Sequence, residues 1–278
     1  MKRLLAAVAA ALLVGSVATP ASATYPGSNG DILYVRGFGE VNALYLMDPS
    51  GEPDGLFYED RGGASIVSPS WSADGQRLAF VRTPGEIWVM RADGTHAKFR
   101  TTGARPSLSP DGTAIAFQRS DEIWVQFPGS SAVQLTDTVG NDEPEWSPDG
   151  SRILYRDNFN AVWVMDPDGS NKVCVLCTGD DATNPTWSPS GKKIAFHYND
   201  EVYIYRLGDP APRQLTTTPR ISEMECSWSP DGRWLVCSAD GRHGPGLETI
   251  RVRDGMRRFL PTPTSAREPA WRPIPVTD

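Results

Sequence analysis

The central repeat of this chain reads Pro144-Glu145-Trp146-Ser147-Pro148-Asp149-Gly150-Ser151-Arg152-Ile153-Leu154-Tyr155. A proline suits the start of a strand, and the tryptophan offers a large face to a core. The Pro-Asp-Gly triplet favours a tight turn, because proline presets φ and glycine accepts the positive φ that closes a hairpin. The apolar run after the turn is typical of a buried strand. Each copy therefore predicts a strand, a turn and a second strand.

The pattern recurs along the whole chain. Its copies begin at Pro69, Pro106, Pro144, Pro185 and Cys226. The residues at the tryptophan position are Trp71, Leu108, Trp146, Trp187, Trp228 and Trp271, with spacings of 37, 38, 41, 41 and 43 residues. A period of roughly 40 to 45 residues, with an aromatic residue and a turn in each unit, is typical of four-stranded propeller blades. Helical repeats would show an apolar period of about 3.6 residues instead.

The two ends of the chain complete one another. Residues 32–35 and 43–47 match the second and third strands of a copy, but no first strand precedes them. The missing strand recurs near the other terminus as Pro269-Ala270-Trp271-Arg272-Pro273. Pairing of the two segments closes a ring, whereas an open ring would expose two strand edges. We predict an all-β fold, a six-bladed β-propeller of four-stranded antiparallel blades closed by pairing of the N- and C-terminal segments.

The combined repeat is x-W-S-P-D-G-x-x-I-A-F followed by I-W-V-M-x-x-D-G and Q-L-T. It resembles the repeat of the TolB carboxy-terminal β-propeller family and covers residues 27–275. The resemblance implies the fold but no particular function, since similar repeats occur in the propellers that cap prolyl-oligopeptidase-type peptidases. TolB itself has an α/β domain before its propeller that takes part in binding envelope partners. We find no segment here that would encode that domain, so TolB's role in the Tol-Pal system is not implied.

Residues 1–23 have the features of a cleaved signal peptide. Lys2 and Arg3 precede an apolar run from Leu4 to Val17, and Ala21-Ser22-Ala23 has the small-residue pattern that a signal peptidase cleaves. We therefore expect an exported protein, secreted or periplasmic, in which residues 24–278 form a single domain.

The composition narrows the possible partners. Without Lys2 and Arg3 the chain has 27 − 2 = 25 basic and 34 acidic residues, a net charge of about −9. This charge argues against a nucleic-acid partner. No second apolar stretch approaches the roughly 18 residues of a membrane helix. We expect no membrane span, no cofactor and a monomer whose partner is a protein or peptide of the cell envelope or extracellular space.

Four cysteines in an exported chain suggest disulfides. Cys226 replaces the proline of the repeat, and Cys237 replaces the aromatic residue of the second strand in the same copy. Both substitutions in one hairpin predict a Cys226–Cys237 bond, because the two positions face one another across the strands. Cys174 and Cys177 form a C-x-x-C in an expected fourth strand, where a local disulfide and two unreactive thiols both fit better than a redox motif.

Few residues form a recognisable catalytic or metal motif. His96, His197 and His243 fall in three different copies, and no G-x-S-x-G motif is present. The stretch Asp166-Pro167-Asp168-Gly169 resembles the start of a calcium loop, but Cys177 stands where the final glutamate belongs. We predict a turn there and no metal site.

The mouth of the axial channel is the remaining candidate site. Residues beside the first-strand proline, and those that end the second strand, should crowd this mouth. One arc is basic and comprises Arg36, Arg82, Arg105 and Arg119. The opposite arc is acidic and comprises Asp142, Glu143, Glu145, Glu223, Glu225 and Glu268. A concave site lined by both signs could hold a peptide or polar ligand, and ordinary solvated loop charge is the alternative.

Three hypotheses for function follow. The first is an exported binding or scaffold module without enzymatic activity. The second is a propeller enzyme, a lyase or a glycoside-processing enzyme, with Glu143, Glu145 or Glu268 as acid and base. The third is an acidic arc that holds a structural ion, which chelator-sensitive melting would reveal. Raised carboxylate pKa values in a closed pocket would favour the enzyme, and an open rim would favour binding.

Overall fold

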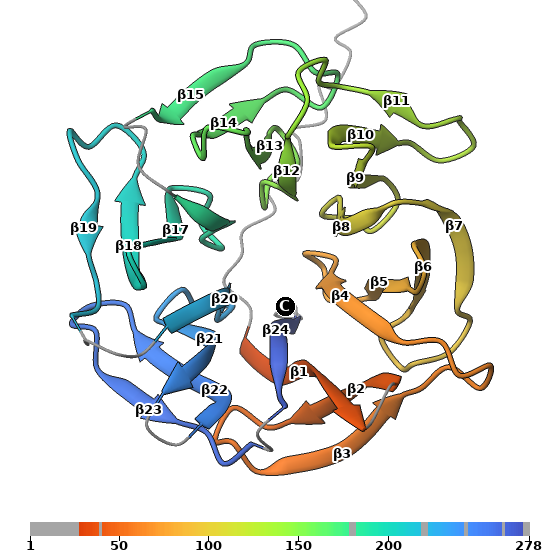
Figure 1. The fold of residues 1–278 in the computed structure, drawn as a ribbon, viewed down its shortest axis with the longest axis vertical. Helices are drawn as coiled ribbons and strands as arrows, with labels where there is room; N and C mark the ends of the chain where they lie inside the picture. The colour runs from red at the N-terminus through yellow and green to blue at the C-terminus, as the bar shows by residue number, and fades with distance from the viewer. Residues whose placement is uncertain are drawn as a thin grey trace, which may run out of the picture.

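The computed structural model describes residues 28–38, 41–177, 182–217, 222–241, 244–262 and 265–274. These residues form six four-stranded antiparallel sheets arranged in a ring around a central axis (Figure 1). The described part of the chain contains no helix with the length and apolar character needed to cross a bilayer. The predicted signal peptide, residues 1–23, lies outside the described residues, as does His243.

We number the blades in the order of their innermost strands. Blades 1 to 3 comprise β4 (Ile66–Trp71), β5 (Arg77–Arg82), β6 (Glu86–Arg91) and β7 (Lys98–Thr102); β8 (Ala104–Leu108), β9 (Ile115–Arg119), β10 (Glu122–Gln126) and β11 (Val133–Gln134); β12 (Asp142–Trp146), β13 (Ile153–Arg156), β14 (Val162–Met165) and β15 (Val173–Leu176). Blades 4 to 6 comprise β16 (Thr183–Trp187), β17 (Lys193–Tyr198), β18 (Glu201–Arg206) and β19 (Arg213–Gln214); β20 (Ser222–Trp228), β21 (Trp234–Gly241), β22 (Gly244–Arg251) and β23 (Arg257–Phe259); β24 (Arg267–Ile274), β1 (Ser28–Phe38), β2 (Val41–Met47) and β3 (Pro53–Tyr58).

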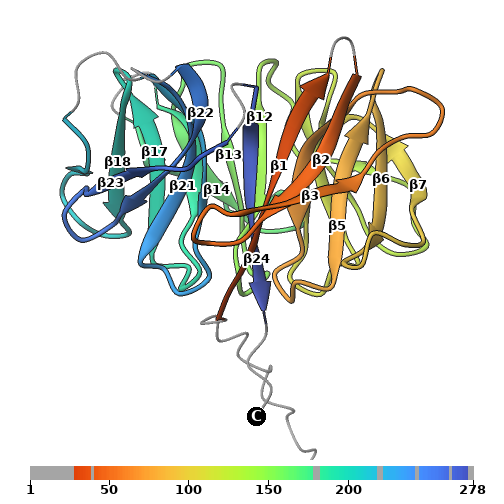
Figure 2. The same cartoon turned by 90° about the horizontal axis from the view of Figure 1, so that it is seen from below.

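The ring closes through blade 6, which takes strands from both ends of the chain. Strand β24 pairs antiparallel with β1, and the register sets Trp271 opposite Ile32 and Ala270 opposite Leu33. Figure 2 shows these two strands side by side through the depth of the ring. This confirms the predicted fold, the blade number and the pairing of the terminal segments.

The turn in the first hairpin is held by a hydrogen-bond pattern that recurs in four blades. In blade 3 the Ser147 hydroxyl donates to Asp149 at 2.6 Å and accepts the Arg152 amide at 2.9 Å. Gly150 has a φ of 72°, which only glycine adopts at low cost. The same serine and aspartate pair occurs in blades 1, 2 and 5, so the Ser-x-Asp-Gly sequence is the local reason for the turn.

The hydrophobic core of the described residues consists of six clusters, and each joins two neighbouring blades. In the cluster between blades 2 and 3, Trp146 and Ile153 of blade 3 pack against Ala116 and Ile123 of blade 2. The tryptophans predicted to enter the core therefore stabilise contacts between blades. Such a ring positions the start of every innermost strand around the axis.

Both cysteine pairs are disulfide-bonded. Cys226 on β20 bonds Cys237 on β21 across directly paired positions, with 4.1 Å between the Cα atoms, as predicted. Cys174 bonds Cys177, which resolves the open alternative in favour of a local disulfide. Two disulfides are consistent with export to an oxidising compartment.

Candidate functional site at the axial channel

The innermost strands carry a shared irregularity at the entrance of the axial channel. All six have a register shift against the second strand at this level. The residue before the proline has a positive φ in five of them, namely Ser68, Arg105, Glu143, Asn184 and Glu268, with values between 48° and 55°. A side chain before proline normally avoids such a conformation. The bulge re-aims these residues, which is a known use of β-bulges near functional sites.

We call six residues the axial ring: Ser68, Arg105, Glu143, Asn184, Glu225 and Glu268. All of them line one cavity of about 280 Å³ on the axis, together with the six following residues at the proline position. A second hollow of about 570 Å³ continues from it and shares Arg105, Glu143, Asn184, Glu225 and Glu268 with it. The ring therefore separates an inner cavity from an outer vestibule.

Glu143 is neutralised by its neighbours. Its carboxylate lies 3.2 Å from Arg105 Nη1 and 3.1 Å from Arg156 Nε. The backbone N–H of Asn184 in blade 4 donates to Glu143 Oε2 at 2.8 Å. Burial raises the pKa of Glu143, and Arg156 and Arg105 oppose that shift. Asp142 lies between the same two arginines, 3.2 Å from Arg105 Nε and 3.5 Å from Arg156 Nη2.

Glu268 plays a similar part between blades 6 and 1. Its carboxylate accepts a hydrogen bond from the Ser68 amide and lies 3.3 Å from Arg267 Nε. In both blades the carboxylate of one ring residue accepts the backbone N–H of the next ring residue. Glu143 and Glu268 therefore hold neighbouring blades together, and arginines and backbone N–H groups already compensate their negative charges.

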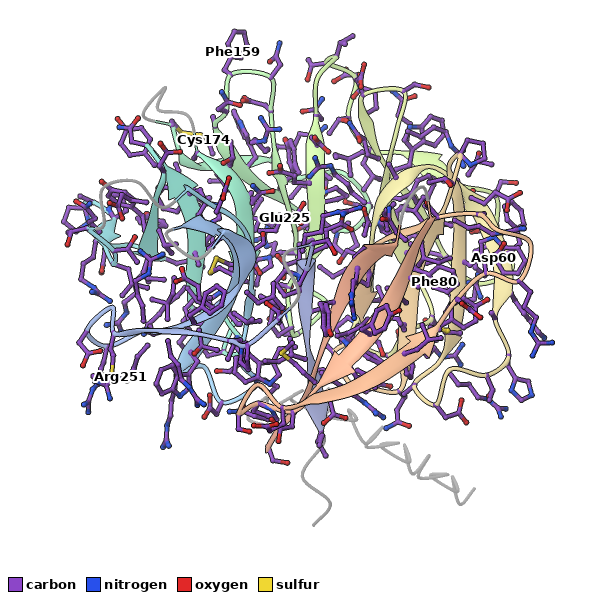
Figure 3. All side chains as sticks on the ribbon, turned by 60° about the horizontal axis from the view of Figure 1, so that its bottom comes forward. Asp60, Phe80, Phe159, Cys174, Glu225 and Arg251 are labelled. Carbon is purple, nitrogen blue, oxygen red and sulfur yellow. A yellow bond between two sulfur atoms is a disulfide. The ribbon has the colours of Figure 1, made fainter. Side chains whose placement is uncertain are left out.

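Glu225 differs from the other two glutamates of the ring. Its amide donates to Ser238 Oγ at 3.2 Å, but its carboxylate has no hydrogen bond or ion pair with any described residue. Burial raises the pKa of Glu225 to about 7, and the negative charge of Glu268 adds to the shift. Figure 3 shows Glu225 near the middle of the molecule. The positive charges of Arg105 and Arg267 oppose this pKa shift only in part, so Glu225 is an acidic group on the cavity wall without a direct partner among the described residues.

A second set of contacts lies one level deeper. Ser107 Oγ accepts the Trp146 amide at 3.0 Å, and Ser227 Oγ accepts the Trp271 amide at 3.0 Å. In blade 3 a carboxylate takes this role, since Glu145 accepts the Trp187 amide at 3.1 Å and the Thr186 hydroxyl at 3.3 Å. Burial raises the pKa of Glu145 to about 8. Glu145 therefore keeps its proton at neutral pH in a structural contact between blades.

Three predicted arginines do not line the axial cavity. Arg36 lies over the Tyr45 ring, with its guanidinium carbon 5.2 Å from the ring centroid. Arg82 lies 2.9 Å from Asp60 and 3.2 Å from Glu86, and Arg119 donates to the Thr102 carbonyl. Figure 3 shows Asp60 at the outer side of the ring, away from Glu225. Arg82 and Arg119 end second strands, and Arg36 lies near the end of one; the partners of all three are on other strands or loops, with Thr102 on β7 of the neighbouring blade.

The structure thus brings Arg105, Glu143, Glu145, Glu225 and Glu268 together on the cavity wall. The side chain of Glu223 lies outside the described residues, although its backbone pairs with Ala239. Sequence reasoning missed Ser68 and Asn184, which hold equivalent positions before a proline. Aligning that one position across the copies would have found them.

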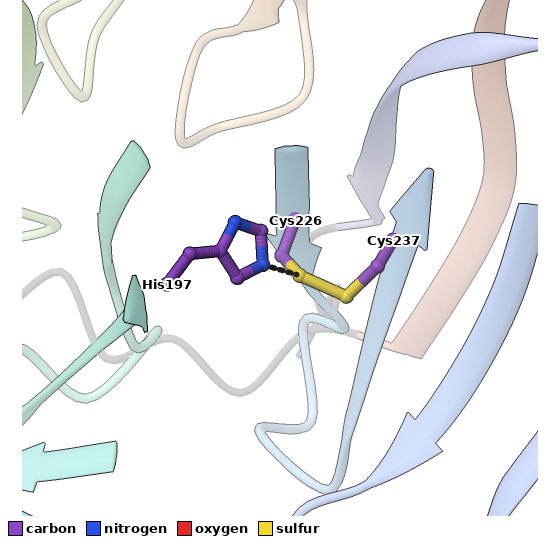
Figure 4. A group of neighbouring side chains, drawn as sticks. All are labelled: His197, Cys226 and Cys237. Carbon is purple, nitrogen blue, oxygen red and sulfur yellow. Dashed lines mark hydrogen bonds between the residues drawn. A yellow bond between two sulfur atoms is a disulfide. The ribbon is translucent and has the colours of Figure 1, made fainter. Parts of the chain in front are cut away.

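One group of side chains has the composition of a soft-metal site. His197 Nε2 lies 3.3 Å from Cys226 Sγ, and Cys237 completes the trio within 4.8 Å (Figure 4). The two sulfurs are bonded to one another. A metal ion would need them as thiolates, so the disulfide form offers no such ligands.

Known proteins place this architecture in a family. A family model for the TolB beta propeller domain matches residues 29–275. The crystal structure of TolB from Acinetobacter baumannii superposes with a TM-score of 0.76 at 23% identity, over 90% of this chain and 68% of that one. An oligogalacturonate lyase in complex with manganese superposes with a TM-score of 0.58 at 17% identity, over 82% of this chain and 72% of that one.

One relative found by sequence is described as a peptidase, unlike the two proteins above. The chain is 26% identical over 204 residues to a Bacillus subtilis protein described as the uncharacterized peptidase YuxL. The match covers 63% of this chain and only 30% of that relative. Neighbours of such different activities share the scaffold, so the fold alone does not identify a function. From the matched span and the six-bladed structure, this chain belongs to the TolB β-propeller domain family.

Proposed function

We propose that this propeller is a non-catalytic binding module whose axial mouth receives a basic segment of a protein or peptide partner. One observation carries the proposal: Glu225 is a largely buried carboxylate on the cavity wall that forms no hydrogen bond or ion pair with a described residue, and the charges of Arg105 and Arg267 offset its burial only in part. Burying a charge without a partner is costly, so a cation at this place would be stabilised. A lysine or arginine side chain, or an amino terminus, has the required charge.

The rest of the axial ring supports a positioning role. Glu143 and Glu268 are held by arginines and backbone amides, so they form a rigid wall around the free carboxylate. Arg105 adds one positive group at the same rim, 40% exposed in its side chain, and could hold a carbonyl or carboxylate of the same segment. The ring can therefore orient a polar segment as well as attract it.

The direct test uses residues 24–278, the chain without the predicted signal peptide, as bait in an extract of the native envelope or culture fluid. Wild type and Glu225→Gln are compared, with Glu52→Gln as a control because Glu52 is an exposed acid in the turn between β2 and β3. We expect one partner to be retained by wild type and Glu52→Gln and lost by Glu225→Gln. Equal retention by all three baits would contradict a role for the mouth.

A second candidate is an enzyme that acts on acidic or other sugars, with Glu143, Glu145 or Glu268 as acid and base. The observation in its favour is Glu145, whose raised pKa of about 8 is typical of a group that can supply a proton at neutral pH. Burial of Glu145 at the contact between blades explains the raised pKa without catalysis, and the hydrogen bonds from Trp187 and Thr186 oppose that shift. Release of new reducing or unsaturated sugar ends from polyuronates, abolished in Glu145→Gln, would favour the enzyme.

A further inference from the structure

A further cavity, distinct from the two on the axis, lies in blade 1 near the turns that join its strands. It encloses about 510 Å³ and is formed by β5, β6, β7 and the turn residues between them, with one residue of β24 from blade 6. Its cationic lining residues are Arg77, Arg91, Lys98, Arg100 and Arg272. Five cations on one wall are unexpected, because the whole chain is net negative.

The strand register places two of these cations against each other. Arg77 on β5 is directly opposite Arg91 on β6. Like charges at directly opposite positions destabilise a sheet. In blade 3 the equivalent positions hold Arg152 and Asp166, whose charged atoms lie 2.7 Å apart. The fold therefore accommodates a neutral pair at this place, and blade 1 has a repulsive pair instead.

Among the described residues one carboxylate, that of Asp93, compensates the cluster in part through its interaction with Arg91. None of the five cations forms an ion pair with a described residue. Asp93 is the only acidic residue on the wall, and its carboxylate accepts hydrogen bonds from the amide and hydroxyl of Thr95, at 2.9 and 2.6 Å. The positive field in this cavity is therefore open to an external anion.

The side chain of Arg272 is held in place by an aromatic ring. Its guanidinium carbon lies 5.2 Å from the centroid of the Trp71 ring, which holds the planar group by stacking. Its Nε is buried and has no hydrogen-bond partner among the described residues. A buried donor without an acceptor is costly, and the Arg272 guanidinium has no compensating acceptor at Nε among the described residues.

We propose that this cavity is a binding site for a phosphate-bearing anion with at least two charges. Its volume is in the range of small-molecule sites, roughly 300 to 1,000 Å³. Arginine is suited to phosphate because its guanidinium donates two parallel hydrogen bonds to two oxygens. Arg77 and Arg91 would hold one phosphate between them, and Arg272 would orient it from the blade 6 side. The site is independent of the axial mouth, which is acidic.

The first experiment measures binding of inorganic pyrophosphate to the mature chain by isothermal titration calorimetry. We expect saturable binding at one site that weakens by roughly tenfold or more in Arg91→Gln and in Arg272→Gln, since each loses a charge-assisted contact. Arg206→Gln is the matched control, because Arg206 also stands opposite a cation, Lys193, but does not line this cavity. Thermal melting of each variant establishes that it is folded.

The outcomes decide the proposal. No saturable binding by wild type would overturn it, as would an equal loss of affinity in Arg206→Gln and Arg91→Gln, which would indicate non-specific charge attraction. Flotation with vesicles of phosphatidylcholine, with and without phosphatidic acid, whose phosphomonoester carries about −1.5 to −2 charges at pH 7, then separates the two sources of phosphate. Flotation with the anionic vesicles that Arg91→Gln abolishes assigns a lipid headgroup, and pyrophosphate binding without flotation assigns a soluble phosphate ester.

Discussion

The two ends of the innermost strands contrast in sequence. At the turn end, the copies repeat nearly the same residues, with serine, aspartate and glycine making the same hydrogen bonds in four blades. At the mouth end, the position before the proline holds serine, arginine, glutamate or asparagine. Residues repeat where every blade needs the same turn, and they vary where side chains project into the cavity. The proposed binding role of the mouth rests on this variation.

The largest expected effect concerns the turn end at ring closure. A Cβ at Gly75 would lie 1.9 Å from the Pro273 carbonyl oxygen of β24, whereas a Cβ at Gly191 would lie 3.8 Å from Pro148. Both glycines have nearly the same positive φ. We expect Gly75→Ala to lower the free energy of unfolding by about 3 kcal/mol, from the clash and the strained φ together. Gly191→Ala should lose only the φ contribution, about 1 kcal/mol. Equal losses in urea denaturation would contradict close packing of β24 on blade 1.

The next effect concerns the mouth end of blade 5, where a disulfide replaces the proline. The pair Cys226→Ser with Cys237→Ser removes a bond with a sequence separation of 11 residues. We expect the free energy of unfolding to fall by about 2 to 3 kcal/mol, because the unfolded chain regains loop entropy. Cys174→Ser with Cys177→Ser opens a separation of only 3 residues and should cost less, about 1 to 2 kcal/mol. Urea denaturation measures both, and the reverse order would show that chain entropy is not the controlling factor.

Per pH unit, a smaller effect distinguishes the structural carboxylate Glu145 from the axial ring. Its folded pKa of about 8 lies above the unfolded value, so the folded state binds more protons between the two values. Stability should therefore fall as pH rises from about 4.5 to about 8, with a slope of up to about 1.4 kcal/mol per pH unit from this group. Glu145→Gln should flatten that slope when unfolding is followed by urea titration at several pH values. A slope unchanged in Glu145→Gln, and unchanged also in the control Glu52→Gln, would place the titrating group elsewhere.

The fold could be predicted from the sequence because its determinants are local. The Pro-x-Trp and Ser-x-Asp-Gly residues form each hairpin by their own turn chemistry, and the period fixes the number of blades. The disulfide of blade 5 was also predictable, because Cys226 and Cys237 replace two positions that face one another.

The charges of the mouth could be predicted only in part. Aligning the prolines placed Glu143, Glu225 and Glu268 near the axis. Arg156, which neutralises Glu143 from the end of a second strand, was not among the predicted residues, whereas Arg82 and Arg119, which also end second strands, were predicted and do not line the cavity. The direction of an arginine side chain depends on the neighbouring aromatic rings and acids, which the repeat pattern does not reveal. The positive φ before the prolines was equally hidden, since proline usually imposes an extended neighbour.

The most direct test of the mouth as a binding site is the affinity of a labelled lysine-rich peptide, measured by fluorescence anisotropy between pH 6 and pH 8. Glu225 has a pKa of about 7 without a ligand, and a bound cation would favour its ionised form. We predict that the Kd of wild type falls about tenfold as pH rises across this range. We also predict that Glu225→Gln binds weakly at every pH. A Kd that is independent of pH, or the same in wild type and Glu225→Gln, would contradict the account.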